Sequence, residues 1–242
     1  MKTLSIIIPA YNEEKSILAL LHEVKKVNLK NVGVQKEIIV VDDGSNDRTA
    51  EILAQEDNIT VLTHTQNQGK GAAIRTGIKH ATGDIILIQD ADLEYEPNEY
   101  PDLLKPILSE KAKVVYGSRY INPTQTNRNK TFLKKHHEKA YPLFYFGGRF
   151  LTTLTNILYG AHITDEATCY KVFARDVIKN IKLDCRRFEF CPEVTAKVRK
   201  QGYNILEVPI SYYPRSMQEG KKIKYRDGLH AIWTLLKYQF IT

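Results

Sequence analysis

The sequence predicts an α/β protein in which a mostly parallel sheet carries helices on both faces. Three observations support this prediction: short, almost continuous apolar runs alternate with stretches of helical periodicity, 43% of the residues are apolar, and no internal repeat interrupts the pattern. Continuous apolar runs are typical of strands buried on both faces. A chain of 242 residues can bury such a core, and we expect one domain over residues 1–242.

The predicted elements follow one another in a regular order. A strand at residues 4–8 ends at Pro9, and a helix over residues 17–27 has its apolar residues at helical spacing, with Asn12 positioned to cap it. The alternation then repeats, with strands predicted at residues 38–41, 59–63, 85–88 and 114–116, and helices at 48–55, 69–81 and 97–108. Such alternation builds a parallel sheet covered on both faces.

Polar side chains gather where these strands end. The first strand leads into Pro9-Ala10-Tyr11-Asn12-Glu13, the second into Asp42-Asp43 and the fourth into Asp90-Ala91-Asp92. Ligands of parallel sheets bind beyond the carboxyl ends of the strands, so we expect one cleft there. The chain lacks both the Gly-x-Gly-x-x-Gly of dinucleotide-binding folds and the Gly-x4-Gly-Lys-Ser/Thr of P-loop proteins. Carboxylates replace glycines, so we expect phosphates to be held through a metal.

Asp90 and Asp92 are the leading candidates for that metal site. They lie two residues apart just after a strand, and Glu94 adds a third carboxylate. Hard divalent cations such as Mg²⁺ prefer carboxylate oxygens and complete their coordination with water and substrate phosphate. The alternative is a solvated acidic loop, because Asp-x-Asp is common at strand ends.

The net charge of +7 is unevenly distributed. Residues 1–120 hold 14 basic and 18 acidic side chains, whereas residues 121–242 hold 21 basic and 10 acidic ones, a net charge of +11. This asymmetry indicates contact of the second half with phosphate, a polyanion or an anionic membrane. A nucleic-acid partner is disfavoured, because the basic residues are not interleaved with aromatic ones and the acidic cleft would be unexplained.

Cysteines and histidines give no sign of a further centre. Cys169, Cys185 and Cys191 form no closely spaced pair of pairs, so we expect free thiols rather than disulfides or a zinc site. His136-His137 has no third ligand spaced near it.

The N-terminus leads straight into the first strand without a small-residue cleavage site, so we expect no secretory signal and a cytoplasmic location.

Several motifs together resemble the family-two glycosyltransferases of the GT-A, Rossmann-like fold. Four of them occur in the family's order and spacing: SIIIPAYNEE at residues 5–14, VVDDGS at 40–45, NQGKG at 67–71 and DADLE at 90–94. Within that family the chain is most similar to dolichyl-phosphate or polyprenyl-phosphate hexosyltransferases, through YGSR at 116–119, TCYK at 168–171, EVPI at 207–210 and PRS at 214–216. The resemblance covers nearly the whole chain and is looser over residues 121–148.

The resemblance implies a donor site in residues 1–120 and an acceptor site in residues 121–242. The donor would be a nucleotide sugar, GDP-mannose or UDP-glucose, and the cation Mg²⁺ or Mn²⁺. Donor-binding positions of the family match Pro9, Tyr11, Glu13, Asp43, Lys70 and Asp90. Its metal-binding acid matches Asp92, which we expect to be catalytic, with Asp90 beside it and Glu94 as a further candidate ligand. A cation suits a nucleoside diphosphate leaving group, which develops negative charge.

The acceptor implied by the resemblance is a polyprenyl or dolichyl phosphate. Phosphate-binding positions match Arg119, Arg149 and Arg215, with Lys222 on the loop that follows, and we expect the three arginines to converge beside Asp92. Gly148 departs from the family, where serine is frequent. Asp165 stands where relatives that act on hydroxyl acceptors place their catalytic base. A lipid phosphate is largely dianionic near pH 7 and needs no strong base, so we expect Asp165 chiefly to position other groups.

Two segments are candidates for contact with a membrane. Residues 141–161 are rich in Phe, Tyr and Leu but contain glycines and polar residues, so an interfacial helix is favoured over a spanning one. The basic run over residues 128–139 could meet anionic head groups, and residues 226–240 form a second amphipathic stretch. The alternative is that both helices simply pack on the protein. We expect a peripheral location on the cytoplasmic face.

Two other enzyme classes stay in view. A family-two glycosyltransferase that acts on a glycan or protein hydroxyl is the nearest alternative. A sugar nucleotidyltransferase has a related sheet, but Pro9-Ala10-Tyr11-Asn12 stands where its glycine-rich loop belongs. The resemblance implies a single displacement with inversion at the sugar carbon.

Overall fold

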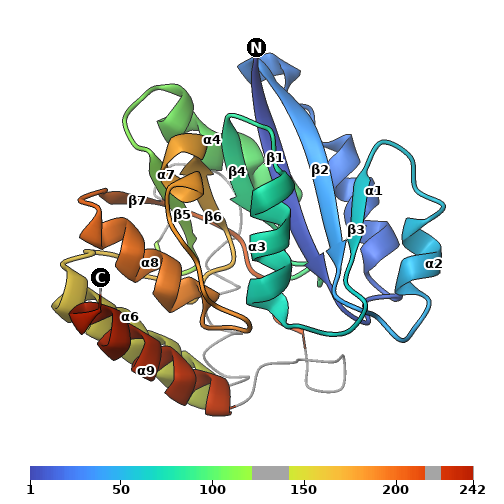
Figure 1. Cartoon of the computed structure of the whole chain (residues 1–242). Coiled ribbons are helices and arrows are strands. Elements are labelled where there is room, and N and C mark those ends of the chain that lie inside the picture. The colour runs from blue at the N-terminus through green and yellow to red at the C-terminus, as the bar shows by residue number, and fades with distance from the viewer. Residues whose placement is uncertain (122–141, 216–224, 242) are drawn as a thin grey trace.

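A computed structural model describes residues 1–121, 142–215 and 225–241 (Figure 1). The strands are β1 (Lys2–Ala10), β2 (Val34–Asp42), β3 (Thr60–Thr63), β4 (Ile85–Ile88), β5 (Val114–Ser118), β6 (Lys171–Ala174) and β7 (Ile205–Pro209). The helices are α1 (Ile17–Lys26), α2 (Thr49–Leu53), α3 (Lys70–His80), α4 (Tyr100–Leu108), α6 (Pro142–Tyr159), α7 (Arg175–Lys179), α8 (Phe190–Lys200) and α9 (Tyr225–Phe240). Two short 3₁₀ helices span Lys30–Val32 and Pro97–Glu99.

All seven strands form one sheet in the order β3-β2-β1-β4-β6-β5-β7. The pairs β1–β2, β1–β4, β2–β3 and β5–β7 are parallel, whereas β6 runs antiparallel to both β4 and β5. The prediction of a mostly parallel α/β sheet is therefore confirmed. The antiparallel strand β6 and the edge strand β7 were not predicted from the sequence.

The core lies around the central strands. Every residue of β1 from Leu4 to Ala10 is buried, as are all four residues of β4, so both strands are covered on both faces. Their continuous apolar runs follow from this burial, because neither face contacts water. Strands β1, β2 and β4 thereby form a rigid base whose carboxyl ends support the loops of the site.

The expectation that Asn12 caps the first helix is wrong. Helix α1 begins at Ile17, after Ser16. Asn12 instead has a left-handed backbone, with φ of 50°, and its Oδ1 accepts a hydrogen bond from the Asn46 backbone at 2.8 Å. Asparagine tolerates this backbone better than most residues because its short side chain bonds locally. Asn12 thus joins the loop after β1 to the loop after β2.

Helices α6 and α9 lie side by side at the lower edge of the molecule and pack against each other and against α8 (Figure 1). In residues 1–121, 142–215 and 225–241, we find no helix that combines the length and the hydropathy needed to cross a bilayer. The basic run over residues 128–139 lies outside the described residues.

Candidate active site

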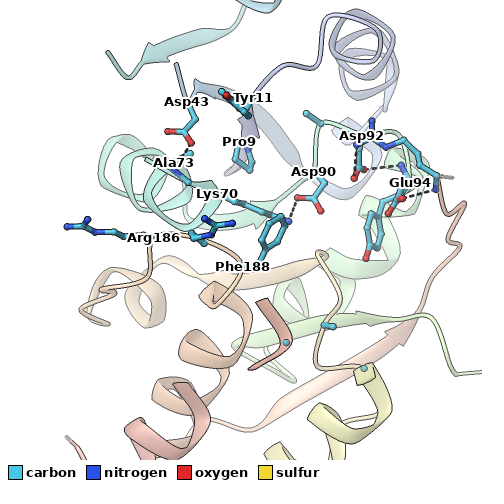
Figure 2. Close-up of a pocket in the computed structure, with 18 of the residues that line it drawn as sticks. Pro9, Tyr11, Asp43, Lys70, Ala73, Asp90, Asp92, Glu94, Arg186 and Phe188 are labelled. Atoms are coloured by element: carbon cyan, nitrogen blue, oxygen red, sulfur yellow. Dashed lines mark hydrogen bonds and ion pairs between the residues drawn. The ribbon is translucent and has the colours of Figure 1, made fainter. Parts of the chain in front are cut away.

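A cleft of about 840 Å³ opens beyond the carboxyl ends of β1, β2 and β4. Ten of the residues singled out from the sequence line it: Pro9, Tyr11, Glu13, Asp43, Lys70, Asp90, Asp92, Glu94, Arg119 and Arg215. Figure 2 labels seven of them, Pro9, Tyr11, Asp43, Lys70, Asp90, Asp92 and Glu94, which come from separate elements and face a common space. The position of the cleft follows the general rule for ligands of parallel sheets.

Asp43 braces the glycine turn that begins α3. Its carboxylate accepts hydrogen bonds from the backbone of Gln68 at 2.9 Å and of Gly69 at 2.7 Å, and His64 Nδ1 lies 2.6 Å from its Oδ1. Gly69 has φ of 99°, and a Cβ there would lie 2.3 Å from the carbonyl oxygen of Arg186. Only glycine fits this turn. The bond expected from Asp43 to a nucleobase stays a prediction.

Lys70 and Asp90 form an ion pair across the floor of the cleft. Lys70 Nζ lies 2.6 Å from Asp90 Oδ1 and 5.7 Å from the centre of the Phe188 ring (Figure 2). Burial alone would lower the pKa of Lys70, but the negative charge of Asp90 outweighs it and raises that pKa above the ordinary value. Lys70 therefore stays positively charged where donor phosphates are expected.

Arg215 links both halves of the chain to the acidic strand ends. Its two terminal nitrogens donate to the carboxylate of Glu13 at 3.1 and 3.2 Å, and Nη2 lies 3.4 Å from Asp92 Oδ2. Its Nε is buried and has no hydrogen-bond partner among the described residues. A buried donor of this kind favours a nearby anionic oxygen.

Both carboxylate oxygens of Glu94 accept hydrogen bonds from the protein. Tyr212 Oη donates to its Oε2 at 2.7 Å, and the Arg215 backbone donates to its Oε1, also at 2.7 Å. Within the described ranges no group of three carboxylate, histidine or cysteine side chains is arranged to hold a metal. The role of Glu94 as a metal ligand stays a prediction. In the structure its carboxylate holds the Tyr212 hydroxyl and the Arg215 backbone.

Asp92 has the electrostatic character of a cation ligand. Burial, with the charges of Asp90 and Glu94, raises the pKa of Asp92 to about 7, although Arg215 and Lys70 oppose the shift. Negative charge is thus concentrated at a desolvated point, which a divalent cation would relieve. The residues present therefore fit Mg²⁺ or Mn²⁺: Asp92 and Asp90 would hold the ion, with water and substrate phosphate as further ligands.

Asp165 is bound to Arg119 through both carboxylate oxygens. Arg119 Nε donates to Oδ2 and Nη2 to Oδ1, each at 2.7 Å, and the Arg119 backbone donates to Oδ2 at 3.1 Å. The Asp165 side chain is 2% exposed. A carboxylate held in this way orients a guanidinium, which agrees with the expected positioning role.

Arg149 lies beside the cleft rather than in its lining. It belongs to α6, its Nη1 donates to the carbonyl oxygen of Thr164 at 3.1 Å, and its guanidinium lies 5.2 Å from the centre of the Tyr120 ring. Arg119 lies 5.8 Å from the same ring, and Tyr120 lines the cleft. Arg119 and Arg215 both line the cleft that contains Asp92, whereas Arg149 lies behind the ring of Tyr120 and outside the lining. Lys222 lies outside the described residues.

Some lining residues were missed in the sequence. Polar and aromatic ones are Tyr120, Arg186, Arg187, Phe188 and Tyr212, and apolar ones from α6 and α9 are Phe150, Leu151, Leu229 and Ile232. Tyr120 follows the YGSR motif directly, so that adjacency was the available signal. The apolar residues of α6 and α9 lie in the two amphipathic stretches noted in the sequence, 141–161 and 226–240. No local pattern marks the remaining residues as lining the cleft, because packing between distant segments places them there.

The mostly parallel sheet with a cleft at the carboxyl ends of its strands is the architecture of the GT-A fold. Residues 5–182 match the family model described as glycosyl transferase family 2, and the chain belongs to that family. It is 31% identical over 245 residues to a UDP-N-acetylglucosamine–dolichyl-phosphate N-acetylglucosaminyltransferase of Methanococcus voltae, covering 92% of this chain and 91% of that protein. It is 30% identical over 248 residues to a dolichyl-phosphate beta-glucosyltransferase of Trichomonas vaginalis, covering 96% and 72%.

Solved structures share the fold at lower identity. The glucosyl-3-phosphoglycerate synthase of Mycobacterium tuberculosis, crystallised with Mn²⁺, uridine diphosphate and phosphoglyceric acid, matches with a TM-score of 0.71 and 21% identity. The match covers 100% of this chain and 80% of that one. A further crystal structure of that synthase, with a TM-score of 0.70, contains Mg²⁺ in place of Mn²⁺.

Proposed function

We propose that the protein transfers a hexose from GDP-mannose or UDP-glucose to a polyprenyl or dolichyl phosphate, with inversion at the sugar carbon. One observation carries the proposal: the cleft joins acidic strand ends, four arginines including Arg119 and Arg215, and an apolar wall from α6 and α9. A nucleotide sugar needs the acidic, cation-binding end, and a lipid phosphate needs the other two. The names of the Methanococcus and Trichomonas relatives, which specify dolichyl phosphate, agree with this acceptor.

The donor would lie over the ends of β1, β2 and β4. Pro9, Tyr11 and Asp43 would surround the base and ribose, Glu13 would hold Arg215 in place, and Lys70 would meet the phosphates. A bound Mg²⁺ or Mn²⁺ would neutralise the charge that develops on the leaving nucleoside diphosphate. The positive charges of Lys70 and Arg215 support the same leaving group from the protein side.

The acceptor phosphate would be its own nucleophile. Its second pKa is about 6, so it is mostly dianionic at pH 7 and attacks the sugar carbon without a general base. Arg119 and Arg215 would orient it, and Asp165 would hold Arg119. A single in-line displacement inverts the configuration, so an α-linked donor gives a β-linked product.

Helices α6 and α9 supply a surface suited to the cytoplasmic face of a membrane. On α6, Phe146, Phe150 and Ile157 are 67%, 56% and 75% exposed, and on α9, Leu229, Trp233 and Phe240 are 64%, 62% and 85% exposed. Within each helix these residues recur at helical spacing, which makes an apolar stripe. Phe150 and Leu229 also line the cleft, so the stripes lead into it. We propose that this peripheral contact delivers the lipid phosphate.

An acceptor assay tests the proposal. Purified protein with Mn²⁺ or Mg²⁺ is incubated with radiolabelled nucleotide sugars and either undecaprenyl phosphate or a soluble glycan. We expect extractable, mild-acid-labile β-linked product with the lipid alone. Transfer to the glycan alone would favour the hydroxyl-acceptor alternative and exclude the lipid one, and turnover of no donor would refute both.

A further inference from the structure

Glu207 on the edge strand β7 binds two consecutive residues of the acceptor side. Its Oε2 accepts hydrogen bonds from the Thr164 backbone at 2.7 Å and from Thr164 Oγ1 at 2.9 Å, and its Oε1 accepts one from the Asp165 backbone at 3.0 Å. The side chain is half-buried and does not line the cleft. Glu207, Thr164 and Asp165 all lie behind the cleft lining, which Asp165 reaches through Arg119.

The same two residues hold two of the three arginines of the expected acceptor site, Arg119 and Arg149. Asp165 binds Arg119 through both carboxylate oxygens, and the Thr164 carbonyl accepts a hydrogen bond from Arg149 Nη1 at 3.1 Å. Arg119 follows β5 directly and Arg149 belongs to α6, so the arginines come from separate elements. Their spacing therefore depends on where residues 164–165 lie.

Sheet pairing explains why Glu207 can fix that segment. Strand β7 pairs in parallel with β5, and Glu207 lies opposite Tyr116, three residues before Arg119. Residues 164–165 belong to an irregular stretch between α6 and β6, so side-chain bonds must supply the anchors that a ladder or helix would give. A carboxylate that accepts three hydrogen bonds is a strong anchor of this kind.

We propose that Glu207 is a positioning residue for the acceptor phosphate, because it sets the separation of Arg119 and Arg149 through Thr164 and Asp165. This inference rests on the proposed lipid-phosphate acceptor. It assigns to Glu207 a role in acceptor recognition that is separable from donor binding, since none of its described contacts reaches Asp43, Lys70 or Asp92.

The test is a kinetic comparison of Glu207→Gln with the unaltered protein. Glutamine has the shape of glutamate, but its NH₂ group would face the backbone N–H of Thr164 or of Asp165. Two donors cannot bond to each other, so one partly buried N–H is left without an acceptor. We expect KM for the lipid phosphate to rise about tenfold, corresponding to about 1.4 kcal/mol, while kcat and the KM for the donor change less than about twofold. A fall in kcat of about tenfold with no change in acceptor KM would overturn the inference.

Glu37→Gln is the matched structural control. The Glu37 carboxylate also braces a loop from a strand: it accepts hydrogen bonds from Ser5 Oγ, from the Thr82 backbone at 2.9 Å and from Thr82 Oγ1 at 2.6 Å. It does not line the cleft. We expect this variant to lose thermal stability with no change in acceptor KM. A rise in acceptor KM equal to that of Glu207→Gln would show that loosening any loop suffices, which would overturn the inference.

Two further variants keep the result interpretable. Thr164→Val removes the hydroxyl that donates to Glu207 and that also lies 2.6 Å from Ser118 Oγ, while keeping both backbone bonds to Glu207. It is expected to raise acceptor KM by less than Glu207→Gln does, so it replaces that variant if the latter fails to fold. Arg119→Lys tests the proposed acceptor site itself, on which the inference about Glu207 depends. If Arg119→Lys leaves acceptor KM unchanged, the proposed acceptor site is wrong; if it raises acceptor KM and neither Glu207→Gln nor Thr164→Val does, the positioning role alone is wrong.

Discussion

Gly69 is the residue whose backbone most directly limits the donor side. Its φ of 99° and ψ of 158° lie in a region that is nearly restricted to glycine, and a Cβ would lie 2.3 Å from the Arg186 carbonyl oxygen. We predict that Gly69→Ala lowers the free energy of unfolding by more than about 2 kcal/mol and weakens donor binding, because the turn presents Lys70. Urea unfolding and calorimetry with a nucleotide sugar measure the two effects.

Gly33→Ala separates the clash from backbone strain. Gly33 also has a positive φ, of 69°, but no atom lies within 4 Å of a Cβ built there. We expect it to cost about 1 kcal/mol and to leave donor binding unchanged. Equal losses of stability in the two variants would contradict the argument from the Arg186 contact.

Asp92 makes the metal-free protein sensitive to pH. Its pKa is raised from 3.8 to about 7, first by burial and then by the charges of Asp90 and Glu94. Between these pH values the native state binds more protons than the unfolded state, so this group's contribution to stability falls as the pH rises from about 4 to about 7 and is constant above that range.

Asp92→Asn should therefore stabilise the metal-free protein while impairing the enzyme. In a chelating buffer at pH 8 we predict a melting temperature at least about 3 °C higher than that of the unaltered protein, with the difference shrinking toward pH 4. Calorimetry across that pH range gives the comparison. A variant less stable than the original at pH 8 would mean that the bond to Arg215 outweighs the cost of burying the charge.

At the scale of elements, α9 contributes a glycine, Gly228, to the apolar wall of the cleft. Gly228 lines the cleft, and a Cβ built on it would meet no atom within 4 Å. A leucine there would project into open space without strain in the helix. We predict that Gly228→Leu raises KM for a long polyprenyl phosphate about tenfold by narrowing the passage, with a smaller rise for a short-chain prenyl phosphate.

Gln239→Leu is the control for added hydrophobicity on the same helix. Gln239 is exposed on α9 and does not line the cleft. The control should leave the acceptor KM of both lipids unchanged, because it leaves the cleft open. If Gly228→Leu affected neither lipid, the acceptor chain would not pass between α6 and α9.

At the scale of the whole molecule, the sequence predicts the parallel half better than the rest. Strands β1 and β4 are readable because they are buried on both faces and hence continuously apolar. Strand β6 was missed because only three apolar residues follow Lys171, and β7 was missed because Glu207 interrupts its apolar run. The strands that they pair with also lie far away in the chain.

The same distinction applies to the cleft. Its place was predictable, because the carboxyl ends of parallel strands meet at one edge. The hydrogen bonds within it were not: Arg215 donates to Glu13 across 202 positions, and Tyr212, from the same distant segment as Arg215, donates to Glu94. Long-range contacts of this kind depend on the assembled fold, and no local periodicity encodes them.

That long-range pairing couples ligand binding to the stability of the whole chain. The proposed donor site combines Asp92 and Lys70 from the first half with Arg215 from the second, so a bound nucleoside diphosphate would bridge segments that unfolding separates. We predict that GDP or UDP with Mn²⁺, at about 100 times its Kd, stabilises the protein by about 2.7 kcal/mol, or about 5–10 °C in melting temperature. Chelation of the metal should remove most of this shift, because the negative charges of the diphosphate, Asp90 and Asp92 would then repel one another.

Comparing the two nucleotides by differential scanning fluorimetry identifies the preferred base, and Asp92→Asn should lose the metal-dependent part of the shift. A shift of the same size in chelator would place the diphosphate on the arginines alone and exclude the cation from donor binding.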